Sequence, residues 1–237
     1  MPRAMVIGFF YSAFFIGLFE SLNTTTALNT GTLYTLVPLG TALLSFVFLK
    51  EKIGYKVIMA YMVGVIGTIW VVFQGNLNNL SSLSLNTGDY LFLLAALSMC
   101  CYSVSMKYLY RDDEMVVLVF CTLLAGSFWI YISIFIFNQP LQWALISGSD
   151  FFNIGYLIVG ATLSTMYLYQ KTTILLGPSR VNAYIYLNPV LISIISFTIY
   201  GDIPKSIIIP GVLLSVSSTL ILQNLYSLKK PNNPTNS

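Results

Sequence analysis

The sequence predicts an all-α polytopic membrane protein with eight transmembrane helices. Of its 237 residues, 57% are hydrophobic and only 8% are charged, whereas about 25% of the residues in a soluble domain are charged. A folded domain of this size cannot hide so much apolar side chain from water in one core. Long apolar stretches also recur along the chain, and a helix needs roughly 20 such residues to cross a bilayer.

Eight stretches have this length: 5–22, 30–49, 55–74, 89–108, 115–137, 152–171, 180–200 and 205–225. The first could be a secretory signal, because a basic residue precedes it. No small-residue cleavage site follows it, however, so we interpret it as a membrane helix. The two longest connections, 75–88 and 138–150, are rich in Asn, Ser and Gly, as loops are. The polar tail 229–237 is predicted to be disordered.

The basic residues predict the orientation. If both termini are cytosolic, ten of the 11 Lys and Arg residues flank the cytosolic ends of the spans, and only Lys205 lies on the other side. This bias matches the positive-inside rule, so we expect a protein of the cytoplasmic membrane with both termini in the cytosol. Topology and contact with lipid head groups explain the basic rim, so we expect no nucleic-acid partner.

Several classes of site are excluded by residue type. The chain has no His, and its three Cys are Cys100, Cys101 and Cys121. These facts argue against His-dependent catalysis, most zinc sites and a disulfide framework. We therefore expect no enzyme, no metal ion and no cofactor. The pairs Gly88-Asp89 and Gly201-Asp202 resemble aspartyl catalytic motifs, but both lie at span edges, which argues against an intramembrane protease.

Two spans share a proline at an offset of 151 residues. Pro38 matches Pro189, and Glu51 matches Asp202. The predicted topology places Glu51 inside and Asp202 outside, so the equivalent helices cross the membrane in opposite directions. Such inverted repeats are frequent in secondary transporters, whose substrate site lies near the midplane where the halves meet. A proline kinks a helix because it removes one hydrogen bond, and a matched pair of kinks indicates such a site.

The span after each proline helix continues the match with small residues spaced four apart. They are Ala60, Gly64 and Thr68 in the first repeat, and Gly211, Ser215 and Thr219 in the second. This spacing puts them on one helix face and permits close packing in lipid, so we predict a packing role for them.

The candidate substrate-binding residues are polar or aromatic and lie mostly near the two prolines. Charged residues within the spans are almost absent, and the nearest, Glu20, is interfacial. Aromatic rings can stack on a ligand while amides orient it. Asn182 and Asn188 are notable because a buried amide needs a partner. The predicted substrate-binding residues are Tyr34, Pro38, Tyr102, Tyr184, Asn188 and Pro189.

In order and spacing, these motifs resemble the EamA-type branch of the drug/metabolite transporter superfamily. The resemblance covers nearly the whole chain except the tail. It implies two five-helix units in an inverted repeat, and the export or exchange of amino acids, nucleotide-like metabolites or other small molecules. The motifs that carry it are 24–27, the helix around Pro38, 49–52, 64–67, 88–89, 94–98, 176–180, 187–190 and 201–202.

Compared with that family, the first unit starts at the equivalent of helix three. The resemblance therefore implies an incomplete (3+5) repeat, with two spans missing before Met1. We predict a partial first unit at 1–75, an external linker at 76–87, a second unit at 88–228 and a cytosolic tail at 229–237. A shortened reading frame, a decayed gene and completion by pairing, as in a homodimer, all stay open.

The leading hypothesis is a secondary transporter that exports a small metabolite, amino acid or nucleotide-like, by alternating access. Its partners would be the small-molecule substrate and membrane lipid. The alternative is a truncated, non-transporting remnant or an accessory subunit of the same family. An upstream in-frame start encoding two further apolar spans would distinguish a wrong start from a short form.

Overall fold

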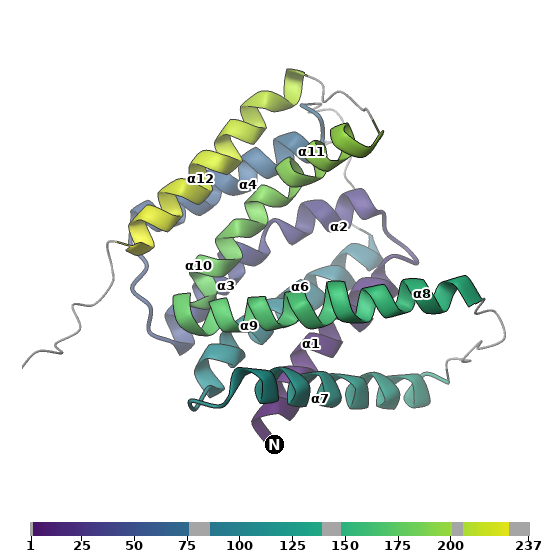
Figure 1. Cartoon of the computed structure of the whole chain (residues 1–237). Helices are drawn as coiled ribbons and strands as arrows, with labels where there is room; N and C mark the ends of the chain where they lie inside the picture. Colours follow the sequence, from purple (N-terminus) through teal and green to yellow (C-terminus); the bar gives the residue numbers. More distant parts are fainter. Residues whose placement is uncertain (1, 76–85, 139–147, 201–205, 228–237) are drawn as a thin grey trace, which may run out of the picture.

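The computed structural model describes residues 2–75, 86–138, 148–200 and 206–227, which form a bundle of helices (Figure 1). Eight helical segments in these ranges are long and apolar enough to cross a membrane, which confirms the predicted number. They are Pro2–Ser21, Asn29–Phe48, Tyr55–Val72, Thr87–Leu109, Met115–Ile136, Asp150–Leu176, Pro178–Ile199 and Ser206–Ser227. The predicted tail 229–237 and much of the predicted linker 76–87 lie outside the described residues.

The spans consist of the following helices. The first part of the chain contains α1 (Pro2–Ser21), α2 (Ala27–Tyr34), α3 (Val37–Phe48), α4 (Tyr55–Val72), α6 (Thr87–Leu109) and α7 (Met115–Ile136). The second part contains α8 (Gly148–Tyr156), the π-helix η2 (Leu157–Ser164), α9 (Thr165–Leu176), α10 (Pro178–Asn182), the 3-10 helix η3 (Ala183–Leu187), α11 (Asn188–Tyr200), the 3-10 turn η4 (Ser206–Ile208) and α12 (Ile209–Ser227).

Both proline-containing spans are broken just before the proline. In the first, α2 ends at Tyr34 and α3 begins at Val37, and the Thr35 amide donates only three residues back, to Thr32 (3.1 Å). In the second, the 3-10 helix η3 leads into α11, which begins at Asn188. We predicted one kinked helix in each case. The structure has two half-helices instead, because proline lacks an N–H and its ring crowds the preceding turn.

The two proline-containing spans lie side by side and run antiparallel. At one end, the Ser179 hydroxyl donates to Glu51 Oε2 (2.6 Å). Further along both spans, Asn182 Nδ2 donates to Thr41 Oγ1 (3.1 Å). Residue numbers rise along one span as they fall along the other, so the equivalent helices cross in opposite directions. This arrangement is compatible with an inverted repeat.

The predicted small residues form the contact between α4 and α12, which also run antiparallel. The Ser218 hydroxyl donates to the carbonyl of Ala60 (2.6 Å). A β-carbon added at Gly67 would lie 2.7 Å from the backbone nitrogen of Ser215, so only glycine allows this approach. These contacts confirm the packing role, since shape and close backbone approach drive helix association in lipid.

The span predicted at 152–171 extends further in both directions, from Asp150 to Leu176. Lys171, which the sequence places at the cytosolic flank, therefore lies within this helix, and its Nζ lies 5.5 Å from the centre of the Tyr167 ring. The helix ends only at Gly177, whose positive φ of 94° is a conformation that favours glycine.

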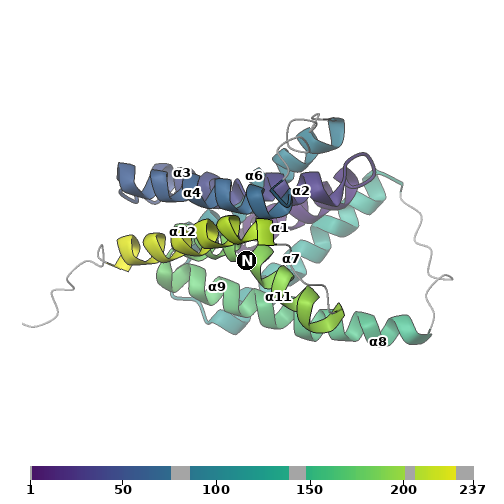
Figure 2. The same cartoon turned by 90° about the horizontal axis from the view of Figure 1, so that it is seen from above.

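The spans are covered unevenly. In an apolar 18-residue stretch of Asp150–Leu176 only 6% of the residues are buried, against 50% in Thr87–Leu109. Viewed from above, α3 and α4 lie on one side of the molecule and α8 and α9 on the other, with α12 between them (Figure 2). In both views α8 projects at the rim (Figures 1 and 2). Its exposed side chains are mostly apolar and include Phe151, Phe152 and Ile154, which suits contact with lipid or with another membrane helix.

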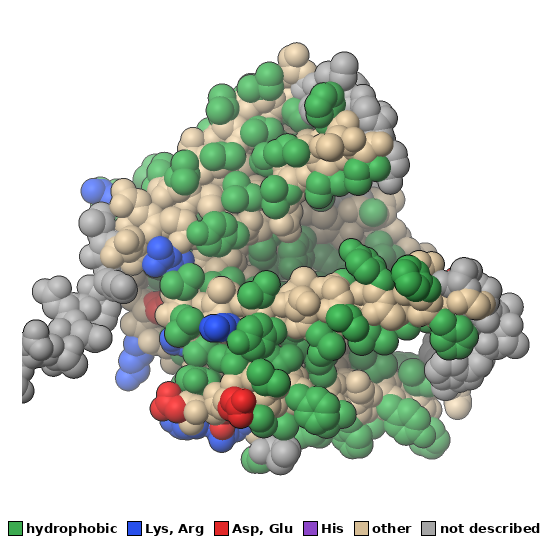
Figure 3. Space-filling model, viewed as in Figure 1, with side chains coloured by type: hydrophobic (Ala, Val, Ile, Leu, Met, Phe, Trp, Pro, Cys, Tyr) green, Lys and Arg blue, Asp and Glu red, His purple; other side chains and the backbone are tan. Residues whose placement is uncertain are grey.

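One end of the bundle collects basic residues. Arg3 forms an ion pair with Asp113 (3.0 Å), and Lys107 donates a hydrogen bond to the carbonyl of Ile174. On the face drawn in Figure 3, the visible Lys and Arg side chains gather at the left, where α9 meets α10, while apolar side chains spread over the helices. All of these basic residues are ones that the sequence places on a single side of the membrane.

Candidate functional site

A cavity of about 320 Å³ lies beside the two proline breaks. This volume falls in the range of roughly 300–1,000 Å³ that small-molecule sites occupy. The two antiparallel proline spans and the last turn of α4 supply its lining, which comprises Gly31, Tyr34, Thr35, Val71, Val72, Ile185, Asn188, Pro189, Ile192 and Ser193.

The helix breaks explain why these side chains meet. Because α2 stops at Tyr34 and α11 starts at Asn188, both spans change direction at the cavity. Tyr34 and Ile185 are equivalent at the 151-residue offset, and both line the cavity. Corresponding positions of the two proline-containing spans therefore meet at one place, which is compatible with a site between inverted halves.

The structure brings together three of the six predicted site residues: Tyr34, Asn188 and Pro189 all line the cavity. The other three lie elsewhere. Pro38 is buried in the first turn of α3, and Tyr102 is buried within the bundle. Tyr184 is 48% exposed and is not part of the lining, because the 3-10 geometry of η3 turns it away from the side that carries Ile185 and Asn188.

Tyr102 belongs to a buried polar network between α3, α6, α9 and α10. At its centre, Asn182 donates to Thr41 and accepts from the Tyr169 hydroxyl (2.9 Å). The Tyr169 hydroxyl also contacts Ser103 Oγ (2.5 Å), and its ring stacks on Tyr102 at 6.0 Å between centroids. These bonds satisfy amide and hydroxyl groups that water cannot reach. The network therefore joins four helices, and we assign Asn182 and Tyr102 a structural role.

Thr35 and Ser193 line the cavity but were missed from sequence. The Ser193 hydroxyl donates to the carbonyl of Pro189 (2.8 Å), and that of Thr35 donates to the carbonyl of Thr32 (2.7 Å). Each lies within about one turn of a helix break, where carbonyls lose their usual helical partners. A search for hydroxyl residues within one turn of the paired prolines would have found both.

The described part of the lining contains no charged side chain. Its polar side-chain groups are the hydroxyls of Tyr34, Thr35 and Ser193 and the amide of Asn188, and the remaining side chains are aliphatic. A ligand with a net charge would find no oppositely charged partner among these residues, and an unpaired charge is costly to desolvate. The arrangement suits a small ligand that has apolar surface and a few hydrogen-bonding groups.

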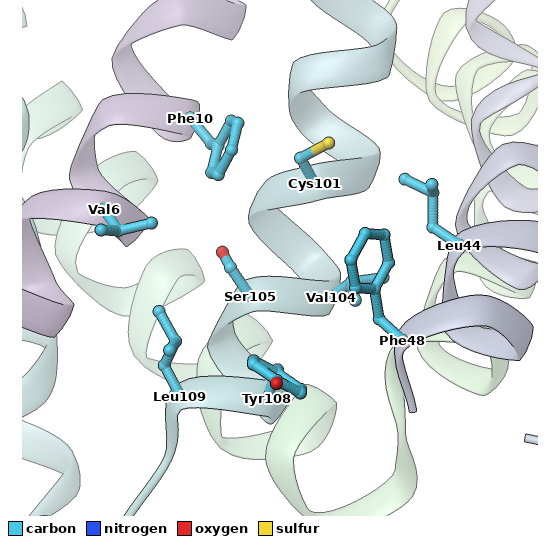
Figure 4. A pocket seen from close by; sticks show the side chains of 9 residues that line it. All are labelled: Val6, Phe10, Leu44, Phe48, Cys101, Val104, Ser105, Tyr108 and Leu109. Carbon is cyan, nitrogen blue, oxygen red and sulfur yellow. The ribbon is translucent and has the colours of Figure 1, made fainter. Parts of the chain in front are cut away.

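A second cavity, of about 260 Å³, lies between α1, α3 and α6 (Figure 4). Phe10, Leu44 and Phe48 reach it from α1 and α3, and Cys101 and Ser105 from α6. The Ser105 hydroxyl is already bonded to the carbonyl of Tyr102 in its own helix (3.0 Å). With so few polar groups available, this cavity suits an acyl chain better than a polar metabolite.

Asp89, one half of the aspartyl pair considered above, is fully buried at the start of α6. Its carboxylate accepts hydrogen bonds from the Thr25 hydroxyl, from Asn29 Nδ2 (3.2 Å) and from the backbone N–H of Asn86 (2.9 Å). It thus caps α6 and joins this helix to α2. Its pair member Asp202 lies outside the described residues.

Comparison with known proteins agrees with this architecture. Residues 2–73 and 86–223 match the EamA-like transporter family. The chain belongs to this family. The match covers nearly the whole chain and supports a membrane transporter rather than an enzyme.

Two curated proteins of Bacillus subtilis (strain 168) are similar to this chain. The chain is 23% identical over 233 residues to the "Uncharacterized transporter YyaM"; this match covers 94% of this chain and 72% of the relative. It is 26% identical over 217 residues to the "Uncharacterized transporter YdfC"; this match covers 91% of this chain and 69% of the relative. One solved crystal structure, 18% identical, superposes with a TM-score of 0.74 over 95% of this chain and 77% of that one, and therefore has the same fold.

Proposed function

We propose that this EamA-family protein is a secondary transporter that moves a small metabolite, amino acid or nucleotide-like, across the cytoplasmic membrane by alternating access. One observation carries the proposal: a cavity of ligand size lies where two antiparallel, proline-broken spans meet. Broken helices at paired positions are the usual setting of a transporter substrate site. In this proposal Tyr34 and Asn188 contact the substrate, and Pro189 shapes the cavity.

The proposal treats the chain as two units. Residues 1–75 form a partial first unit of three spans, 76–87 an external linker and 88–228 a second unit of five spans, followed by a cytosolic tail. The antiparallel contacts of α3 with α10 and of α4 with α12 support this division, since each pair joins one helix from each unit. The substrate site then lies between the units.

We expect positions in the linker to face the outside and both termini to face the cytosol. Single cysteines introduced at 76–87 should react with an impermeant maleimide in intact cells, whereas a cysteine at position 230 should react only after permeabilisation. The reason is the ten-to-one distribution of basic residues. The reverse pattern of labelling would overturn the orientation.

Uptake into proteoliposomes tests the activity. We expect saturable uptake of an uncharged or zwitterionic solute from a panel of labelled amino acids and nucleosides, because the described lining carries no charge. Protein-free liposomes serve as the control. If neither this chain nor a version extended upstream moves any solute, the alternative of a non-transporting remnant or accessory subunit is favoured.

A further inference from the structure

The cavity lies towards one end of the bundle. Gly31 is near the start of the first proline-containing span, Val72 ends α4, and Ser193 lies well along α11. Glu51, which follows α3, and Ser179, in the first turn of α10, lie at the opposite end of the same helices. In the proposed orientation the cavity is therefore in the outer half of the membrane, and Glu51 and Ser179 are at the cytosolic side.

Ser179 is held at this cytosolic end by two residues of the first unit. Its hydroxyl donates to Glu51 Oε2 (2.6 Å), and its carbonyl accepts from the Tyr61 hydroxyl (2.9 Å). The Tyr61 hydroxyl also contacts that of Tyr226 in α12 (3.1 Å). Ser179 and Tyr61 are fully buried. A hydrogen bond to a carboxylate is roughly twice as strong as a neutral one, so this contact is a firm one.

The backbone is shaped to allow this contact. Gly177, directly before α10, has a φ of 94°, and a β-carbon added to it would lie 3.2 Å from Glu51 Oε1. A side chain at this position would be strained and would press on the Glu51 carboxylate. The chain therefore passes close to Glu51 just where Ser179 becomes able to donate to it.

We propose that Glu51 and Tyr61 form the cytosolic gate of the transport cycle, and that the gate is closed while both are hydrogen-bonded to Ser179. This inference rests on the proposed function. The contacts join the first unit to the second across the end of the bundle that lies opposite the cavity. Passage of substrate between the cavity and the cytosol then requires Ser179 to leave both partners, while water replaces the lost hydrogen bonds. Glu51 and Tyr61 are positioning residues, because neither lines the cavity.

A second pair of contacts at the same end lies entirely within the second unit. Arg180 Nε donates to Gln223 Oε1 (2.6 Å), and Gln223 Nε2 donates to the Arg180 carbonyl (3.0 Å). These bonds connect α10 to α12 and would move with the second unit when the gate opens. Gln223 therefore provides a matched control: a short polar contact beside the gate that does not cross between the units.

The test uses a single-cysteine probe in the full chain, with the three native cysteines replaced by alanine. Ala42 is buried in α3, between the gate and the cavity, and becomes the probe as Ala42→Cys. Its reaction with an impermeant maleimide in inside-out vesicles reports opening to the cytosol. A second probe, Thr35→Cys in the cavity, reports opening to the outside in right-side-out vesicles.

We expect Tyr61→Phe and Glu51→Ala each to raise the labelling rate at position 42 by about tenfold, since one buried hydrogen bond to a charged or backbone group shifts an equilibrium by that order. The same variants should lower labelling at position 35, because a protein that opens inward closes outward. Glu51→Gln keeps a neutral acceptor for Ser179, so it should raise the rate by less than Glu51→Ala does. Gln223→Ala should leave both rates unchanged.

Three results would overturn the gate. The first is an unchanged labelling rate at position 42 in the gate variants. The second is a higher rate at both positions 42 and 35, which indicates general loosening of the bundle. The third is an equal rise of the rate at position 42 in Gln223→Ala. Folding of each variant is checked by size-exclusion chromatography in detergent. The labelling needs no substrate, so its result is independent of uptake. If the parent protein takes up a solute but the gate variants label like the parent, the gate is rejected and the transport function is kept. If the gate variants raise labelling at position 42 and lower it at position 35 but no solute is taken up, the gate is kept and the proposed substrates are rejected.

Discussion

Asn188→Leu is expected to reduce the uptake rate at least about tenfold while the amount of folded protein stays close to that of the parent. Asn188 lines the cavity, is exposed there, and has no side-chain hydrogen bond to any other described residue. Its removal therefore leaves no buried group unpaired in the bundle. Loss of one hydrogen bond to a substrate is worth about 1.4 kcal/mol or more, which corresponds to a factor of ten.

The matched control is the same substitution at Asn182. That amide is fully buried and bonded to Thr41 and Tyr169, so Asn182→Leu should lower the amount of folded protein, since each stranded polar group costs about 1–3 kcal/mol. Folded protein and uptake are measured together in both variants. If Asn188→Leu lowers them in proportion, Asn188 only holds helices together, and if uptake is unchanged, Asn188 is not part of the site.

Gly67→Leu is expected to destabilise the folded protein by about 3 kcal/mol, because it would wedge apart α4 and α12. Even the β-carbon would lie 2.7 Å from the Ser215 backbone nitrogen and 2.8 Å from Leu214 Cβ. Backbone atoms cannot move aside as a flexible side chain can. The survival of monodisperse protein after heating in detergent measures the effect.

Gly155→Leu is the matched control, on a helix with open space around the glycine. No atom lies within 4 Å of a β-carbon added there, so this variant should be neutral or slightly stabilising, because leucine favours a helix over glycine by up to about 1 kcal/mol. Equal losses of stability in the two variants would mean that the α4–α12 contact is not the reason for Gly67. A stable Gly67→Leu protein would contradict the close approach itself.

Asn182 and Asn188 show what the sequence alone does not determine. Both are amides beside the second proline, six residues apart, and nothing local separates their roles. Their neighbours differ: α3 and α9 pack against Asn182 and bury it, whereas Asn188 opens onto the cavity. Tyr184 was predicted as an aromatic residue shortly before Pro189, and the 3-10 geometry of η3 places it away from the side that carries Ile185 and Asn188.

The number of spans, the family and the pairing of the two prolines were predictable from the sequence. Each depends on properties that a linear chain carries by itself: the length of an apolar run against the thickness of a bilayer, the sign of the flanking charges, and the lack of an N–H at proline. The lining of the cavity was decided only by tertiary structure. Tyr34 and Asn188 are 154 positions apart in the chain, and they meet because the two broken spans pack side by side in antiparallel directions, joined by contacts such as that of Asn182 with Thr41. Such packing depends on shape in three dimensions, which residue spacing along one helix does not specify.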